Sequence, residues 1–207
     1  MRVVEVCKQG GTGEMRITGG ERRGTRIEVP GARVRPTSDM VREALFSALA
    51  DRIPGCRFID LFAGSGVVGL EALSRGASFV CWVESSVHVL RVLKENVTRA
   101  ITGDPLSATR SQVYRSDAIR FLEKGGLDGG AEPFDVIFAD PPYDTDGSNA
   151  WLRKALKALE KTTMLAAEGL LVFEQAKKQP DELLSDAWQV IRDRTYGGTR
   201  VLFLRKS

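Results

Sequence analysis

Short apolar runs that alternate with helix-compatible segments dominate the middle of this chain. Five of these runs are rich in β-branched and apolar residues and have the length of strands: residues 57–61, 79–83, 112–115, 134–139 and 169–173. Each of the first four precedes a segment that can be helical. Strands connected in this way lie parallel in a sheet with both faces covered. The pattern predicts a doubly wound, mostly parallel α/β sheet of the Rossmann-like class.

The last part of the chain departs from this alternation. Residues 188–194 and 199–205 are two strand-like runs, and only Thr195-Tyr196-Gly197-Gly198 separates them. A link this short joins neighbouring strands antiparallel. The whole sheet is therefore expected to have seven strands and to end in an antiparallel hairpin.

A smaller basic unit precedes the sheet. Residues 15–18 and 25–29 flank a turn rich in Gly and Arg, which predicts a β-hairpin, and residues 40–50 follow as a helix that Ser38 or Asp39 could cap. Seven arginines and only three acids lie between residues 15 and 42, although the whole chain carries a net charge of only +3. The expected organisation is a disordered extension (1–14), a basic hairpin and helix (15–52) and the sheet domain (53–207).

Composition excludes several classes of protein. No stretch approaches the roughly 18 apolar residues that span a bilayer, and the first residues lack the apolar centre of a secretory signal, so a soluble, cytoplasmic protein is expected. The three cysteines are far apart without a CxxC pair, and His88 is the one histidine. A disulfide framework, a metal site and Ser-His-Asp catalysis are therefore not expected.

A glycine-rich turn follows the first strand of the sheet. Gly64 and Gly66 let the backbone pass close to a ligand, and the amides of a helix that begins near Val67 favour polar or anionic groups. With Gly69 they fit the G-x-G-x-x-G spacing, which does not distinguish a dinucleotide from S-adenosylmethionine. Glu84, about 20 residues further on, ends the second strand, where a carboxylate can bind both ribose hydroxyls.

Asp117 ends the third strand in the same register as Glu84. It could accept a hydrogen bond from an adenine amino group, or it could only cap the helix expected at residues 118–122. The residues leave both interpretations open.

Asp140-Pro141-Pro142-Tyr143 follows the fourth strand and carries the most specific chemistry. Its two prolines make the turn rigid. Such a turn can hold an amine, and an exocyclic base nitrogen needs to be held because its lone pair is delocalised into the ring, which makes it a poor nucleophile. The Asp140 carboxylate and the Pro141 carbonyl can accept hydrogen bonds from the two N–H groups of the base amine. This orients the nitrogen lone pair toward a sulfonium methyl group, while Tyr143 stacks on the base. The motif predicts amine methylation at the edge of the sheet that also carries the glycine turn.

Several segments together resemble one family. They are Met15 to Gly20, Arg35 to Asp39 with Val41 to Phe46, Asp60 to Gly66 with Gly69 to Ala77, and Asp140 to Tyr143. The sequence is similar to the small-subunit (16S) ribosomal RNA guanine-N2 methyltransferases called RsmD, of the class I S-adenosylmethionine-dependent superfamily. The resemblance runs from Met15 to about Arg205, and neither residues 1–14 nor the loop at 128–132 belongs to it.

The resemblance implies a cofactor, a substrate and a set of site residues. S-adenosylmethionine would be bound by the glycine turn, by acids after two strands and by a lid segment, namely Asp60, Phe62, Ala63, Gly64, Ser65, Gly66, Glu84, Asp117, Ala118, Arg35 and Thr37. The substrate would be the N2 amine of a guanine in 16S ribosomal RNA, within a small-subunit particle or an assembly intermediate. The N-terminal hairpin would help hold that RNA, which gives a role to its arginines Arg22, Arg23 and Arg26.

Three other functions fit the sequence less well. A DNA adenine-N6 methyltransferase shares the Asp140–Tyr143 turn but normally needs a region that reads a duplex, for which little sequence remains. A protein-glutamine methyltransferase more often carries Asn in place of Asp140 and gives the arginines no purpose. A nucleic-acid-binding module without activity would not need acids at 60, 84, 117 and 140.

Overall fold

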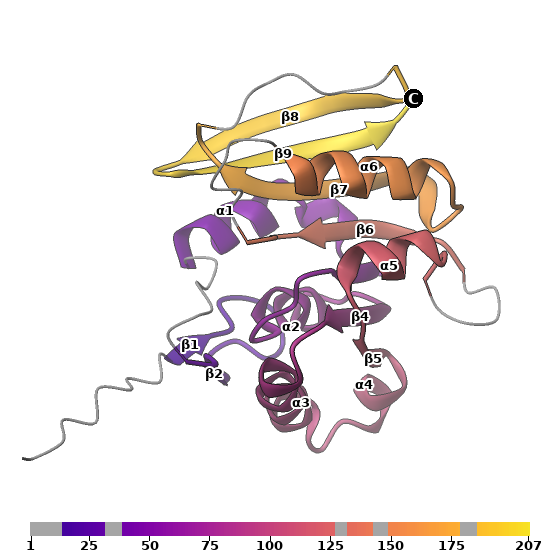
Figure 1. Ribbon diagram of the computed structural model, residues 1–207. Helices are drawn as coiled ribbons and strands as arrows, with labels where there is room; N and C mark the ends of the chain where they lie inside the picture. Colours follow the sequence, from indigo (N-terminus) through magenta and orange to yellow (C-terminus); the bar gives the residue numbers. More distant parts are fainter. Residues whose placement is uncertain (1–13, 32–38, 127–131, 143–148, 179–185) are drawn as a thin grey trace, which may run out of the picture.

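The computed structural model describes residues 14–31, 39–126, 132–142, 149–178 and 186–207, and a seven-stranded sheet is its centre (Figure 1). The strand order is β5-β4-β3-β6-β7-β9-β8. The strands are β3 (Arg57–Asp60), β4 (Phe79–Glu84), β5 (Ser111–Arg115), β6 (Phe134–Ala139), β7 (Leu165–Ala176), β8 (Trp188–Tyr196) and β9 (Thr199–Lys206). The first five are parallel to one another, and β9 pairs antiparallel with both β7 and β8. The predicted fold class is confirmed.

Helices cover both faces of the sheet because side chains alternate along each strand. On one face, Phe58 and Val136 pack in a cluster with α1 (Asp39–Ala48), α2 (Val67–Ser74) and α3 (Val87–Ile101). On the other face, Ile59 and Ile137 pack with α5 (Ala118–Glu123) and α6 (Ala150–Glu160). Across the described ranges, no helix is both long and apolar enough to cross a membrane.

Most predicted bounds shift by one or two residues, and the clearest differences from the sequence prediction concern three elements. Strand β7 begins at Leu165 rather than at residue 169, and the register with β6 shifts between Phe134 and Val136. Helix α1 ends at Ala48, and a short 3-10 turn, η1 (Ala50–Arg52), continues it. Helix α4 (Pro105–Thr109) was not predicted, although Pro105 begins it and the Asp104 carboxylate accepts hydrogen bonds from the amides of Leu106 and Ser107.

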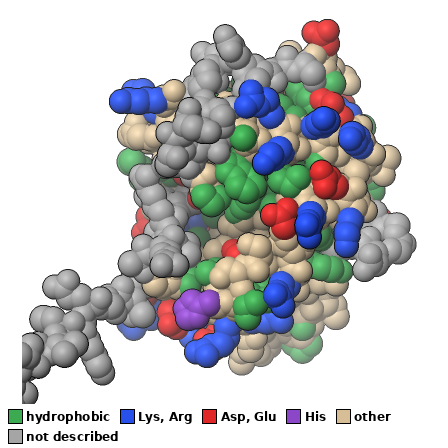
Figure 2. Space-filling view, in the orientation of Figure 1, with side chains coloured by type: hydrophobic (Ala, Val, Ile, Leu, Met, Phe, Trp, Pro, Cys, Tyr) green, Lys and Arg blue, Asp and Glu red, His purple; other side chains and the backbone are tan. Residues whose placement is uncertain are grey.

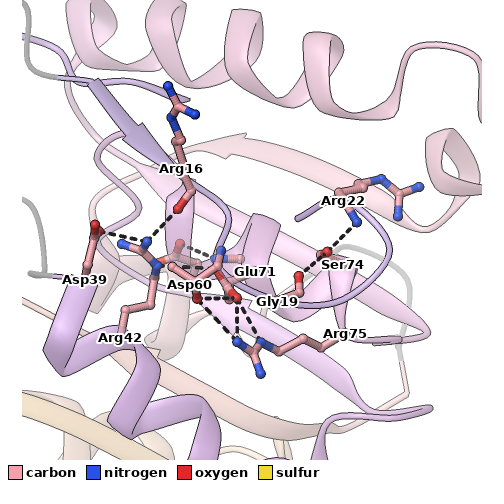
Figure 3. Close-up of polar contacts among 11 residues, drawn as sticks. Arg16, Gly19, Arg22, Asp39, Arg42, Asp60, Glu71, Ser74 and Arg75 are labelled. Carbon is pink, nitrogen blue, oxygen red and sulfur yellow. Dashed lines mark hydrogen bonds and ion pairs between the residues drawn. The ribbon is translucent and has the colours of Figure 1, made fainter. Parts of the chain in front are cut away.

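The predicted N-terminal hairpin is present as β1 (Glu14–Arg16) and β2 (Arg26–Glu28), with Met15 opposite Ile27. It is fixed to the sheet domain through the buried carboxylate of Glu71 in α2 (Figure 3). The amide and the hydroxyl of Thr18 donate to the two carboxylate oxygens at 2.8 and 2.9 Å. Arg42 of α1 donates at 3.3 Å, and Arg75 donates twice, at 2.9 and 2.7 Å. The hairpin, α1 and α2 therefore meet at a single buried carboxylate.

Candidate functional site

The glycine turn between β3 and α2 passes close to its neighbours. Gly64 and Gly66 have φ values of 52° and 81°, a region that favours glycine. The Ala63 amide donates a hydrogen bond to the Val83 carbonyl of β4 at 3.1 Å. A Cβ on Gly66 would lie 2.3 Å from Leu93 Cδ1. The turn is thus tied to the end of β4, and α2 begins at Val67 as predicted.

Gly69 has a different role from the two glycines of the turn. A Cβ at this position would lie 2.2 Å from Trp82 Nε1. Trp82 is fully buried in β4 and its indole N–H donates to the Gly66 carbonyl at 3.1 Å. The third glycine of the motif therefore permits close packing of α2 on the sheet.

Asp60 is the last residue of β3 and is only 2% exposed. The pKa of Asp60 is raised to about 8. Burial is the largest cause, a hydrogen bond from the Gly69 amide at 2.9 Å lowers the pKa, and the negative charges of Asp140 and Glu84 raise it. The ends of three adjacent strands, β4, β3 and β6, thus bring acidic side chains within electrostatic reach of one another. Such an edge favours a cation.

Glu84 links the glycine turn to the next helix. Its Oε2 accepts a hydrogen bond from the Gly64 amide at 3.1 Å, and its Oε1 accepts one from the Ser86 amide at 2.7 Å. The carboxylate is half-buried, beside the backbone of the turn. The position agrees with a ligand that runs from Gly64 across the end of β4.

Asp117 and Ala118 follow β5 at the same edge. Asp117 caps α5, because its Oδ1 accepts a hydrogen bond from the Arg120 amide at 3.0 Å, and its side chain is exposed. Ala118 is buried. The cap that the sequence left open is present, and an exposed carboxylate at this edge remains compatible with an adenine contact.

The turn after β6 begins where the strand leaves the core. Ala139 is fully buried, Asp140 is half-buried, Pro141 is buried and Pro142 is exposed. The Leu61 amide, at the start of the glycine turn, donates a hydrogen bond to the Phe138 carbonyl at 2.8 Å. The two turns therefore leave the sheet side by side. Tyr143 lies outside the described residues, as do Arg35 and Thr37 of the expected lid.

Two aromatic rings flank this part of the edge. Phe62, in the glycine turn, is half-buried and meets Trp151 of α6 in a T-shaped contact with ring centroids 5.4 Å apart. The Lys154 ammonium lies 5.5 Å from the Trp151 ring centre. Phe62 was predicted at the site, whereas nothing in the spacing of residues 149–161 indicated that Trp151 would reach it.

Gln175, near the end of β7, is a polar residue that the sequence analysis missed. Since Ala139 pairs with Phe173, Gln175 lies two residues beyond that pair, next to the Asp140–Pro142 turn. It is 4% exposed, and neither of its amide atoms has a hydrogen-bond partner among the residues that the structure describes. A polar residue after the apolar run of a parallel strand is the signal that also identified Glu84, and it could have identified Gln175.

The three hairpin arginines occupy different surroundings. Arg22 is largely buried: its guanidinium contacts the Asp104 carboxylate, the Ser107 hydroxyl and the Ala100 carbonyl. Its amide also donates to Ser74, as Figure 3 shows. Arg26 is exposed and pairs with Glu14 at 3.3 Å, and Arg23 is exposed. Arg22 therefore holds the hairpin to the domain, and only Arg23 and Arg26 present their side chains outward.

Comparison with known proteins extends over almost the whole chain. A family model described as "Conserved hypothetical protein 95" matches residues 15–205. Ribosomal RNA small subunit methyltransferase D of Escherichia coli K12 is 34% identical over 188 residues, which cover 90% of this chain and 87% of that protein. The putative rRNA methyltransferase YlbH of Bacillus subtilis is 33% identical over 195 residues, covering 93% and 99%.

Solved structures agree with these sequence matches. The putative methyltransferase yhhF from Escherichia coli superimposes with a TM-score of 0.79 at 31% identity, covering 94% of this chain and 99% of that one. A ribosomal protein L11 methylase from Lactobacillus delbrueckii subsp. bulgaricus, at 18% identity and a TM-score of 0.62, shares the fold alone, over 81% and 78% of the two chains.

Proposed function

Because this chain belongs to the family of ribosomal RNA small subunit methyltransferase D, we propose that it transfers a methyl group from S-adenosylmethionine to the N2 amine of a guanine in small-subunit (16S) ribosomal RNA. The observation that carries the proposal is the position of the Asp140–Pro142 turn. It leaves the sheet beside the glycine turn, and the charge of Asp140 reaches the buried Asp60. A methyl acceptor and a methyl donor can meet only where both turns are adjacent.

The acidic edge fits S-adenosylmethionine, which carries a sulfonium and an ammonium cation and supplies an electrophilic methyl group. Negative charge from Asp140 and Glu84 adds to the burial that raises the pKa of Asp60, and a cationic ligand reduces this repulsion. We assign the methionine part to residues 60–66 and the ribose to Glu84. Adenine is assigned to Asp117 and Ala118. The lid formed by Arg35 and Thr37 remains a prediction outside the described residues.

Asp140 and Pro141 hold the amine that accepts the methyl group. One carboxylate oxygen of Asp140 and the Pro141 carbonyl accept hydrogen bonds from the two N–H groups of guanine N2. These hydrogen bonds turn the nitrogen lone pair toward the methyl group. Pro142 keeps the turn rigid because its ring restricts φ. Stacking of Tyr143 on the base, which lies outside the described residues, completes the proposed site.

The hairpin contributes to RNA binding through Arg23 and Arg26 in this proposal. Both side chains are exposed, whereas Arg22 is engaged with Asp104. Arg26 also pairs with Glu14, so a phosphate has to compete with that carboxylate. The substrate is ribosomal RNA in a small-subunit particle or an assembly intermediate, and such a substrate implies a cytoplasmic enzyme. The absence of a metal from the reaction remains a prediction. In the described part of the chain, no group of three His, Cys, Asp or Glu side chains is placed to hold a metal ion.

Transfer of tritium from labelled S-adenosylmethionine tests the proposal against its alternatives. The acceptors are small ribosomal subunits, naked 16S ribosomal RNA, DNA and protein. Label in RNA that digests to N2-methylguanosine supports the proposal. Label in DNA adenine would instead support the adenine-N6 reaction, which shares the Asp140–Tyr143 turn, and label in none of them would contradict enzymatic methylation of these substrates.

A further inference from the structure

Helix α6 carries an exposed row of basic side chains that the sequence analysis did not assign. Its apolar side, which includes Leu152, Leu156 and Leu159, is buried in the core. The opposite side and the residue that caps the helix expose four cations and a single carboxylate: Arg153, Lys154, Lys157, Lys161 and Glu160. In Figure 1 α6 lies in front of the sheet, and in the same orientation Figure 2 shows Lys and Arg side chains gathered over this region.

These cations differ in their partners from most cations of the N-terminal hairpin, where Arg23 is the exception. In the hairpin, Arg16 and Arg26 pair with Glu14, and Arg22 pairs with Asp104. On α6, neither Lys157 nor Lys161 forms an ion pair within the described part of the chain. The Lys154 ammonium lies over the Trp151 ring. Positive charge that the protein does not neutralise attracts a polyanion, because binding releases the counterions of the polyanion.

The row begins at the proposed active site. Trp151, in the first turn of α6, contacts Phe62 of the glycine turn with ring centroids 5.4 Å apart. Lys154 lies next to Trp151, and Lys161 follows seven residues later, about 10 Å further along the helix axis. A nucleic-acid strand whose base occupies the site can therefore continue along α6.

We propose that Lys154, Lys157 and Lys161 form a docking surface for the phosphate backbone of nucleotides that flank the target guanine in RNA. The inference rests on the proposed function, because it takes the Asp140–Pro142 turn as the place of the target base. It moves most of the electrostatic contact from the hairpin to α6. The lysines bind RNA and do not take part in the chemistry.

The test replaces the three lysines together, as Lys154→Gln, Lys157→Gln and Lys161→Gln, since glutamine keeps helix propensity and removes charge. Binding to small ribosomal subunits from cells lacking the protein, and to naked 16S ribosomal RNA, is measured over a range of salt concentrations. The slope of log K against log salt should become shallower by about 2, at roughly 0.7 per lost phosphate contact. KM for RNA should rise roughly tenfold while kcat stays unchanged.

A matched control removes the same charge from the other side of the sheet. Arg91, Lys94 and Arg99 are exposed on α3, which packs in the other core cluster, and each is changed to Gln. The control should leave the salt slope close to that of the unaltered protein. An equal decrease in the salt slope of RNA binding in both triple variants would mean that RNA is attracted non-specifically and would overturn the inference. So would a salt slope and KM in the α6 variant equal to those of the unaltered protein. If the unaltered protein methylates RNA in that case, the proposed function stands without the α6 surface.

Discussion

Asp60, the last residue of β3, and Glu71, in the middle of α2, are two buried carboxylates of the same strand-turn-helix unit, and their surroundings differ sharply. Glu71 is fully buried and accepts five hydrogen bonds, from Thr18, Arg42 and Arg75. Asp60 is 2% exposed, accepts one amide hydrogen bond from Gly69 and lies near the negative charges of Asp140 and Glu84. Glu71 is satisfied by the fold itself, whereas the described residues give Asp60 no ion pair.

The difference separates a structural site from a functional one. A buried charge that is paired from several sides fixes the relative positions of the hairpin, α1 and α2. A buried acid without a positive partner costs stability, and a protein retains such an acid where a ligand supplies the missing charge. The same chemical change, carboxylate to amide, should therefore have opposite effects at the two positions.

The largest expected effect is that of Glu71→Gln. The amide cannot balance Arg42, which is fully buried, so we expect a loss of about 3–5 kcal/mol in the free energy of unfolding. Urea denaturation at pH 7 measures it. Arg75→Gln is the matched control, because the Arg75 side chain is 28% exposed and should cost much less. Equal losses in both variants would show that Glu71 is not the centre of the network.

Asp60→Asn should have the opposite sign. Because the pKa of Asp60 is raised from 3.8 to about 8 on folding, the folded state loses stability as the pH rises between these values. At pH 9 the amide removes this cost but leaves its own N–H donors to be satisfied. We expect a net gain on the order of 2–3 kcal/mol at pH 9, and little or no gain near pH 4. Urea denaturation at both pH values checks this, and a loss of stability at pH 9 would contradict it.

Cofactor binding should also depend on this acid. A cationic ligand prefers the ionised Asp60, so binding below pH 8 requires the release of a proton. Affinity for S-adenosylmethionine should rise roughly tenfold from pH 6.5 to pH 8 and then level off. Calorimetry in two buffers of different ionisation enthalpy detects the released proton. The Asp60→Asn variant should bind more weakly and without this pH dependence; an unchanged profile in the variant would assign the proton to another group.

Gln175→Leu should give the smallest change. Within the described ranges, both amide atoms of Gln175 are buried without hydrogen-bond partners, and leucine fills a similar volume without the cost of desolvation. We expect a gain of about 1 kcal/mol in the free energy of unfolding by denaturant titration. Gln112→Leu, at an exposed position on β5, is the control and should change stability little. A destabilised Gln175→Leu protein would mean that the amide contributes to the fold.

Sequence patterns predicted the sheet well because each strand is marked locally. The apolar run of β6 ends at Ala139 as predicted, and Asp140 and Pro141 follow it. The Glu71 network was not predictable in the same way. Arg42 was counted with the basic surface, but its guanidinium is fully buried beside a carboxylate 29 residues away in the sequence. Charge can be counted from a sequence, whereas the partner of each charge depends on tertiary packing.

The same limit applies to the candidate site. The acids Glu84 and Asp140 were predictable because the carboxyl ends of parallel strands share one edge, whereas Asp60 was predicted from the family resemblance. Trp151 and Gln175 were not identified, because helix α6 and the end of β7 approach this edge only in the folded chain. The hairpin arginines were predicted as a group, and the fold separates Arg22, which holds Asp104, from the outward Arg23 and Arg26.

We propose that the acidic edge around Asp140 methylates guanine N2 in small-subunit ribosomal RNA. Mass-spectrometric mapping of 16S ribosomal RNA tests it most directly, in cells that lack this protein and in the same cells supplied with either the unaltered chain or Asp140→Ala. Loss of one N2-methylguanosine, restored by the unaltered chain and not by a folded Asp140→Ala protein that still binds S-adenosylmethionine, is the predicted result. An unchanged methylation map, or restoration by Asp140→Ala, would contradict the claim.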